Sequence, residues 1–202
     1  HRARCGDVDQ ADDVLALAVD IVLRRRQGNV VVNLTTSSAI DDIAKAHGCR
    51  VYRTPVGEAN VVELMQATNA VIGGEGSSGG IIFPAVHLCR DSYTGIAFLL
   101  DRMAETGCKI SELAAALPHY HRLSGKQTFE HGVLGQLMQN LEEGFPDART
   151  DRSDGLKLLF DGAWIHVRSS NTEPLLRLAV EAKSAAAAED LYGQVMDLLR
   201  EK

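Results

Sequence analysis

The chain has 202 residues, of which 45 % are hydrophobic and 24 % are charged, proportions that are ordinary for a globular protein. Its formal net charge of −6 argues against nucleic acid as a main partner, because nucleic-acid-binding surfaces are usually basic. Its longest apolar runs are too short to cross a bilayer, so we expect no membrane-spanning segment.

The N-terminal residues, His1 to Cys5, show neither an initiator Met nor a signal-peptide pattern. We therefore expect the chain to be a piece of a longer protein. The four cysteines, Cys5, Cys49, Cys89 and Cys108, are far apart and form no Cys-x-x-Cys pair. This spacing is typical of reduced thiols in a cytoplasmic protein, and it argues against a zinc site.

Helices and strands alternate over the first half of the chain. Apolar residues recur at helical spacing over 11–26, with Asp12 or Asp13 as a cap. The run at 29–34 is almost continuously apolar, as in strands buried on both faces of a parallel sheet. Further helices are expected at 37–47 and 60–68, and further strands at 50–53, 70–72 and 81–83. This alternation predicts an α/β domain with a largely parallel sheet.

Two loops in this half fall at the carboxyl ends of expected strands, where ligands of open α/β sheets gather. The first is 54–58, with the sequence TPVGE, and the second is the glycine-rich segment 73–80. Glycines let a backbone approach a ligand closely, and Glu75 offers two acceptor oxygens that suit vicinal sugar hydroxyls. A flexible turn explains the glycines equally well. The carboxylate and the missing P-loop lysine disfavour a phosphate site there.

The first half closes with a long helix from 91 to about 105 and a short helix that begins at 111 and stops before Pro118. We place a domain boundary there, with an α/β domain at 1–118 and a second domain at 119–202. His119 and His121 form a close pair without an obvious third ligand. They are more simply linker or strand residues than a metal site.

The second half combines strands with two helices. Strands are expected at 121–128, 156–160, 163–167 and 175–180, with a tight hairpin at Asp161-Gly162. An amphipathic helix is expected at 130–143 and a final helix from 183 onward. The pattern predicts a small α+β domain, a sheet covered by two helices.

The segment between the last two strands is rich in groups that bind anions. These are Arg168, Ser169, Ser170, Asn171 and Thr172, with Arg177 just beyond. Hydroxyl and backbone N–H groups donate hydrogen bonds to anions, and a guanidinium matches phosphate oxygens two at a time. The segment therefore favours a phosphate or carboxylate site, although serine, asparagine and proline are also ordinary turn formers.

The motif RxSNTEPxxR at 168–177 resembles the phosphate-binding loop in the C-terminal domain of the α-D-phosphohexomutases. That family includes phosphomannomutase, phosphoglucomutase and phosphoglucosamine mutase. The resemblance implies that a substrate phosphate is held by Arg168, Ser170, Asn171, Thr172 and Arg177.

The segment GGEGSSGG at 73–80 resembles the sugar-binding loop of the third domain in the same family. The resemblance implies that Glu75 holds sugar hydroxyls together with Ser77 or Ser78, since the segment is one residue longer than the related GEGNGG form. Glycine stands where some members have histidine. The segment TPVGEAN at 54–60 resembles the loop that faces the reacting end of the sugar, with Gly57 and Glu58 at its centre. Glu58 fits equally well as a first-turn carboxylate that favours its helix N-terminus.

Family members move phosphate between O1 and O6 of a hexose through a bisphosphate intermediate. They use a phosphoserine loop in the first domain and Mg²⁺ held by the second. Neither upstream loop occurs in this chain, and its N-terminal aspartates fit helix capping better than metal binding. The resemblance thus implies the third and fourth domains of a cytoplasmic mutase. This part has no catalytic residue or metal ligand of its own, and its partners are a phosphorylated hexose and the upstream domains.

Other interpretations remain. Glu75 and a serine suit glucose, mannose and glucosamine phosphates alike, so phosphoglucosamine mutase is an alternative. A non-catalytic phosphosugar-binding module would show the same two loops. A nucleotide-binding α/β protein is disfavoured, because 73–80 lacks the Rossmann spacing and an acidic residue at the usual distance.

Overall fold

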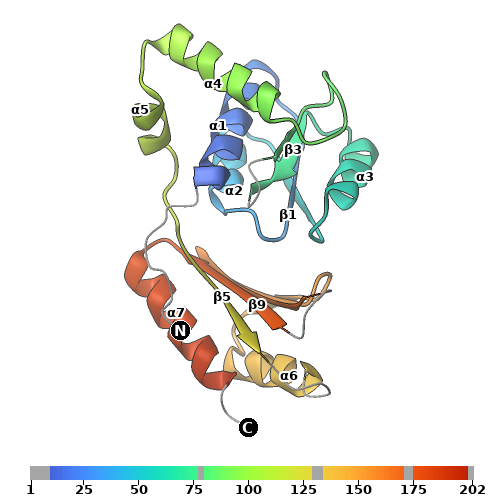
Figure 1. Cartoon of the computed structure of the whole chain (residues 1–202), viewed down its shortest axis with the longest axis vertical. Helices are drawn as coiled ribbons and strands as arrows, with labels where there is room; N and C mark the ends of the chain where they lie inside the picture. Colours follow the sequence, from blue (N-terminus) through green and yellow to red (C-terminus); the bar gives the residue numbers. More distant parts are fainter. Residues whose placement is uncertain (1–9, 77–79, 129–133, 171–174, 200–202) are drawn as a thin grey trace. The chain divides into compact units, whose positions relative to one another are not determined.

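The computed structural model describes residues 10–76, 80–128, 134–170 and 175–199. The chain divides into two compact units, one spanning Asp9–His119 and the other built on Tyr120–Lys202 (Figure 1). We refer to them as the N-terminal unit and the C-terminal unit. None of the helices within the described ranges is both long and apolar enough to cross a membrane.

The described part of the N-terminal unit is built on a four-stranded sheet in the order β2-β1-β3-β4. Strands β2, β1 and β3 are parallel, while β4 runs antiparallel beside β3. The largely parallel α/β architecture predicted from the sequence is confirmed. The strands are β1 (Val30–Asn33), β2 (Val51–Thr54), β3 (Ile72–Glu75) and β4 (Gly80–Ile82), and the helices are α1 (Gln10–Arg25), α2 (Ala39–Ala46), α3 (Glu58–Thr68), α4 (Ser92–Thr106) and α5 (Ile110–Ala115).

The apolar strand β1 shows why this sheet lies between layers of helices. Val30 and Val32 pack in a cluster with α1 and α2, whereas Val31 packs with Val61 and Met65 on the α3 side. Figure 1 shows α3 on one side of the sheet and α1 with α2 on the other. Because period-two alternation places neighbouring residues on opposite faces, both faces of β1 are buried.

The third strand differs from the sequence prediction. We expected a strand at 70–72 and a glycine-rich loop from residue 73, but β3 begins at Ile72 and continues through Gly73 and Gly74 to Glu75. A Cβ atom on Gly73 would lie 2.6 Å from the Val31 carbonyl oxygen, and one on Gly74 would collide with the Gly80 carbonyl oxygen. These glycines therefore allow close strand and helix packing, which outweighs their low strand propensity.

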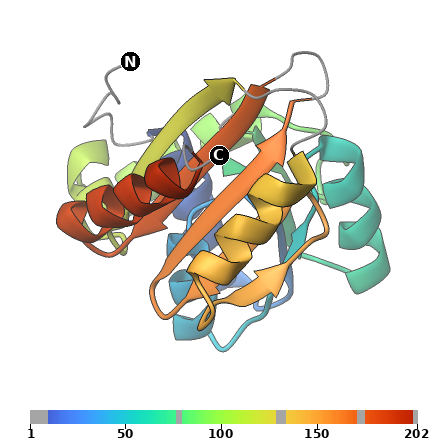
Figure 2. The ribbon, with the colours of Figure 1, turned by 90° about the horizontal axis from the view of Figure 1, so that it is seen from below.

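The described part of the C-terminal unit is an antiparallel sheet of five strands in the order β5-β9-β8-β7-β6. Its two helices lie on one face of that sheet, as Figure 2 shows, so the predicted α+β arrangement is confirmed. The elements are β5 (His121–Thr128), α6 (Leu134–Gly144), β6 (Arg149–Asp151), β7 (Leu156–Phe160), β8 (Ala163–Ser169), β9 (Leu175–Ala182) and α7 (Ala185–Leu198).

Alternation in β8 and β9 separates an apolar face from a polar one. Ile165 and Val167 of β8, with Leu176 and Leu178 of β9, belong to the core under the helices. The residues between them, including Arg168 and Arg177, therefore lie on the opposite face. The short polar strand β6 was not predicted, because its sequence RTD has no apolar alternation and only its pairing with β7 defines it.

Candidate functional site

Glu75 is the last residue of β3 and is held in a fixed position although its side chain is charged. Only 6 % of the residue is exposed. Its Oε1 accepts hydrogen bonds from Asn33 Nδ2 at 2.9 Å and from the Gly57 N–H at 2.8 Å. Its Oε2 lies 3.5 Å from Arg90 Nη1. A buried carboxylate needs such partners, and here they come from two strand ends and a distant loop.

Glu58 is the first residue of α3, where its charge favours the helix N-terminus, one of the two roles that the sequence left open. Its Oε2 accepts from Arg90 Nε at 2.7 Å, and its Oε1 accepts from the backbone N–H of Arg90 at 3.0 Å. The side-chain hydrogen bond from Arg90 is the main cause that lowers the pKa of Glu58. Helix α3 begins at Glu58, not at residue 60 as expected, because Gly57 turns the chain with a φ of 134°.

Arg90 therefore joins the two carboxylates. It follows β4 by several residues and precedes Asp91, whose side chain accepts from the Tyr93 N–H and caps α4. With Arg90 between them, Glu58 and Glu75 form one cluster at the carboxyl end of the parallel strands. This is the edge where ligands of open α/β sheets bind.

Asn33 completes this strand-end cluster from β1. Its side-chain oxygen accepts from both the N–H and the hydroxyl of Thr35 and from the hydroxyl of Thr36. Thr36 in turn accepts from the Gly76 N–H at 3.1 Å. Asn33 thus ties the end of β1 to the end of β3 and sets the orientation of Glu75.

Asn33 and Arg90 were not predicted from the sequence as site residues. Asn33 had a usable signal, because it is a polar residue at the carboxyl end of an apolar strand. Arg90 had none, since its partner Glu58 lies 32 residues away in the sequence. The structure does bring together the predicted Gly57, Glu58 and Glu75, while Ser77 and Ser78 lie outside the described residues.

Asp12 does not cap α1 as expected. The helix already includes Gln10, so Asp12 and Asp13 lie within its first turn. Asp12 is buried, and its carboxylate accepts from the Ser37 N–H at 3.5 Å. A Cβ atom on Gly76 would collide with this carboxylate. Asp12 therefore contributes a tertiary contact beside the strand-end cluster.

Three of the predicted phosphate-binding residues, Arg168, Ser170 and Arg177, lie at the β8–β9 hairpin of the C-terminal unit. Arg168 of β8 is directly opposite Arg177 of β9. The hairpin continues one step further, because the Ser170 N–H donates to the Leu175 carbonyl at 2.7 Å. Arg168 is half-buried and Arg177 is exposed. The structure brings these three residues together, while Asn171 and Thr172 lie outside the described residues.

Gly155 supports the backbone of Arg168 from the neighbouring turn. Its φ of 77° is in the left-handed region, which favours glycine. A Cβ atom there would collide with the Val167 carbonyl and lie 2.9 Å from the Arg168 Cα. The close approach of this turn therefore fixes where β8 presents Arg168.

His166 lies two residues before Arg168 and is buried. Burial lowers its pKa below 6.5, and the positive charges of Lys157 and Arg168 act in the same direction. The Asp154 carbonyl oxygen, 2.7 Å from Nε2, opposes this shift. Because a carbonyl only accepts hydrogen bonds, Nε2 carries the proton of the neutral ring.

We expect the C-terminal unit to lose stability as the pH falls below about 6.5. The folded pKa of His166 is depressed, so the unfolded chain takes up this proton first, and stability rises with pH between the two pKa values. The stability gained from neutral His166 is fully present at pH values above the pKa that this histidine has in the unfolded chain. Urea unfolding at pH 5.5 and 7.5, followed by fluorescence of the single tryptophan, Trp164, measures it. The variant His166→Gln should show a flatter pH dependence, and an unchanged dependence would contradict the assignment.

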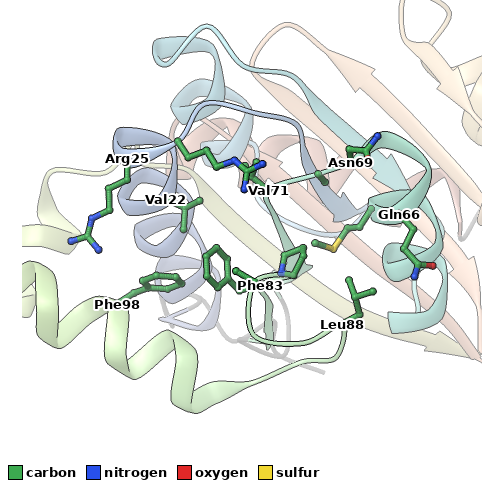
Figure 3. Close-up of a pocket in the computed structure, with 13 residues that line it drawn as sticks. Val22, Arg25, Gln66, Asn69, Val71, Phe83, Leu88 and Phe98 are labelled. Atoms are coloured by element: carbon green, nitrogen blue, oxygen red, sulfur yellow. The ribbon is translucent and has the colours of Figure 1, made fainter.

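A separate groove of about 510 Å³ lies at the other end of the sheet in the N-terminal unit (Figure 3). Its wall includes Val71, which precedes β3, and the aromatic rings of Phe83 and Phe98. Arg25 at its rim is already paired with Asp101 at 2.5 Å. None of the site residues predicted from the sequence lines this mostly apolar groove.

No group of three or more His, Cys, Asp or Glu side chains is arranged to hold a metal ion within the described ranges. The cysteines that fall in those ranges, Cys49, Cys89 and Cys108, are free thiols.

Two family models match the chain. Phosphoglucomutase/phosphomannomutase, alpha/beta/alpha domain III, matches residues 10–120, and the C-terminal domain of the same family matches residues 135–198. A phosphoglucomutase/phosphomannomutase of Thermococcus kodakarensis is 37 % identical, over 95 % of this chain and 42 % of its own length. A probable phosphoglucosamine mutase of Methanopyrus kandleri is 34 % identical, over 94 % of this chain and 42 % of its own length.

The fold agrees with these matches. A phosphoglucomutase/phosphomannomutase family protein from Burkholderia thailandensis superposes with a TM-score of 0.77 at 23 % identity, over 94 % of this chain and 41 % of that one. The chain spans less than half the length of these relatives. It belongs to the phosphoglucomutase/phosphomannomutase family, whose third and C-terminal domains it matches, as its two motifs predicted.

Proposed function

We propose that this chain is the C-terminal part of a phosphohexomutase and binds a phosphorylated hexose through both units. The observation that carries the proposal is the direct cross-strand pairing of Arg168 with Arg177. Like charges directly opposite each other are unfavourable, and a bound phosphate would turn their repulsion into attraction. Ser170, with Asn171 and Thr172 of the same motif, would supply further hydrogen bonds to that phosphate.

The N-terminal unit would hold the sugar itself. In this proposal Glu75 accepts hydrogen bonds from sugar hydroxyls, with Ser77 or Ser78 beside it. A carboxylate oxygen accepts more than one hydrogen bond, so a hydroxyl can join Arg90 at Oε2 of Glu75. Gly57 and Glu58 would face the reacting end of the sugar. Arg90 places a positive charge against both carboxylates and orients them, which matters because a bound sugar shields them from water.

The reaction itself would take place with the upstream domains. Phosphate would move between O1 and O6 of the hexose through a bisphosphate intermediate, with the phosphoserine supplied upstream. Mg²⁺, bound by an upstream domain and not by this chain, would neutralise charge on the transferred phosphate. The residues of this chain would bind and orient the substrate in either direction. Such positioning contributes on the order of several kcal/mol to a barrier reduction.

The names of the relatives support the choice of substrate class in this proposal. Phosphomannomutase/phosphoglucomutase activity is the first candidate, and phosphoglucosamine mutase activity is the alternative, since relatives of both names match almost the whole chain. A cytoplasmic location of the full protein is part of the same proposal.

Titration calorimetry with glucose 1,6-bisphosphate tests the proposal. Replacing Arg168 by Ala removes a charge-assisted hydrogen bond, worth about 1.5–3 kcal/mol, so the affinity should fall at least about tenfold. Arg152→Ala is the matched control, because Arg152 lies in the same unit and pairs with Glu142 on α6. The proposal fails if the wild-type chain does not bind, or if the two variants bind equally well.

A further inference from the structure

The strand register of the C-terminal unit places three cations in one row. Arg168 of β8 is directly opposite Arg177 of β9, and Arg177 is directly opposite Lys126 of β5. Directly opposed residues of antiparallel strands share a face, with Cβ atoms about 4.5–5.5 Å apart. All three side chains therefore leave the sheet on the face opposite the helices. Only two of these cations, the arginines, belong to the motif at 168–177. Lys126 is 51 residues away from Arg177 in the sequence.

Neighbouring rows on this face do not neutralise the cations. The next row toward the sheet centre is Ser124, Ala179, His166 and the buried Lys157, and the row toward the hairpin loop pairs Thr128 with Leu175. The buried Glu181 lies beyond, opposite Trp164, whose indole N–H donates to it at 2.8 Å. Within the described residues, Lys126, Arg168 and Arg177 have no ion pair with a carboxylate. Three adjacent cations of this kind favour a multiply charged anion.

We propose that Lys126 is a third phosphate-binding residue, and that it makes this subsite select doubly charged phosphate esters over singly charged anions. The inference rests on the proposed function, because it assigns a further residue to the same subsite. A phosphate ester carries a charge of about −1.5 to −2 at pH 7. The two guanidinium groups match its oxygens in pairs, and Lys126 adds a compact charge with three donors from the side of β5. Lys126 is exposed, so its side chain can reach an anion centred on Arg177.

NMR titration of the 202-residue chain with glucose 6-phosphate and glucose 6-sulfate tests the inference. The two esters share the sugar and differ mainly in charge. We expect Lys126→Gln to weaken phosphate ester binding by up to about fivefold, the upper end for a single exposed ion pair, and sulfate ester binding less. Lys126→Arg should restore most of the loss. Lys183→Gln removes the same charge from an exposed lysine beyond the far end of β9 and should leave both affinities unchanged.

The possible results separate this inference from the proposed function. If Arg168→Ala weakens binding while Lys126→Gln binds as wild type, the inference about Lys126 is wrong, and the proposed role of Arg168 in phosphate binding is supported. If Lys126→Gln loses the same factor of affinity for both esters, Lys126 does not select for the charge of the anion. If the wild-type chain binds neither ester, that result contradicts both the proposed function and the assignment of a phosphate ester as the ligand of this subsite.

A second measurement tests the row of cations without any ligand. In phosphate-free buffer of low ionic strength, Lys126→Gln relieves repulsion and should raise the thermal midpoint of Trp164 fluorescence by roughly 1–4 °C. Adding a phosphate ester should reduce or reverse that advantage. If the midpoint of the ligand-free variant is unchanged, the three cations do not repel one another as the inference requires.

Discussion

Replacing Glu75 by Ala is expected to destabilise the N-terminal unit by about 2–5 kcal/mol and to abolish sugar binding there. The variant removes the acceptor of the Asn33 side-chain amide and of the Gly57 N–H. Asn33 is completely buried, so its donor would have no water to replace the lost carboxylate. Each such unsatisfied group costs about 1–3 kcal/mol. Arg90 would also lose one of its two carboxylate neighbours.

Glu75→Gln is the matched control for this prediction. Its amide oxygen can still accept from Asn33 and Gly57, while the charge that faces Arg90 is lost. We expect a smaller loss of stability for Gln than for Ala, with weaker sugar binding in both. Because the single tryptophan lies in the C-terminal unit, circular dichroism and amide hydrogen exchange in β1 and β3 are the suitable probes. Wild-type protection of β3 in the Ala variant would show that Glu75 does not hold the strand ends together.

The second large effect is expected at the turn that supports Arg168. Gly155→Ala should destabilise the C-terminal unit by about 2–5 kcal/mol, through a left-handed φ and a backbone collision. The atoms in the way are the Val167 carbonyl and the Arg168 backbone, which cannot move without shifting β8. We therefore expect the variant also to lose at least about tenfold in affinity for glucose 1,6-bisphosphate. Trp164 fluorescence during urea unfolding reports the stability of this unit.

Gly162 provides a control within the same unit. Its φ of 76° nearly equals that of Gly155, but the atoms nearest to a Cβ there belong to the flexible end of Lys183, at 2.8 Å. Gly162→Ala should therefore cost little more than the left-handed strain, about 1–2 kcal/mol, and leave phosphate affinity unchanged. If the two substitutions change stability and phosphate affinity equally, the close approach of Gly155 to Arg168 contributes nothing to either quantity.

Local patterns in the sequence were sufficient for most of the fold. The apolar run at 29–34 predicted a strand buried on both faces, and the strand expected at 121–128 has the bounds that the structure shows for β5. Such patterns work because side-chain periodicity depends only on neighbouring residues. The two family motifs were readable for the same reason, since each lies within one short segment.

Contacts between distant segments could not be predicted in this way. Asn33 and Glu75 are 42 residues apart, and Glu58 and Arg90 are 32 apart, yet these pairs form the strand-end cluster. The sequence around one residue of each pair gives no information about which distant residue will be its partner. The extension of β3 through two glycines was missed because it depends on the space left by Met65 and by the Gly80 backbone.

Local sequence patterns were enough to predict the α/β and α+β architecture, the family, and the segments that carry the sugar and phosphate motifs. Only the folded chain shows that Arg90 joins Glu58 to Glu75, and that Lys126 lies beside Arg177. These contacts depend on strand register and loop packing, which are set by the sum of many non-local contacts. A shift of one residue in the pairing of β5 with β9 would turn Lys126 to the opposite face of the sheet.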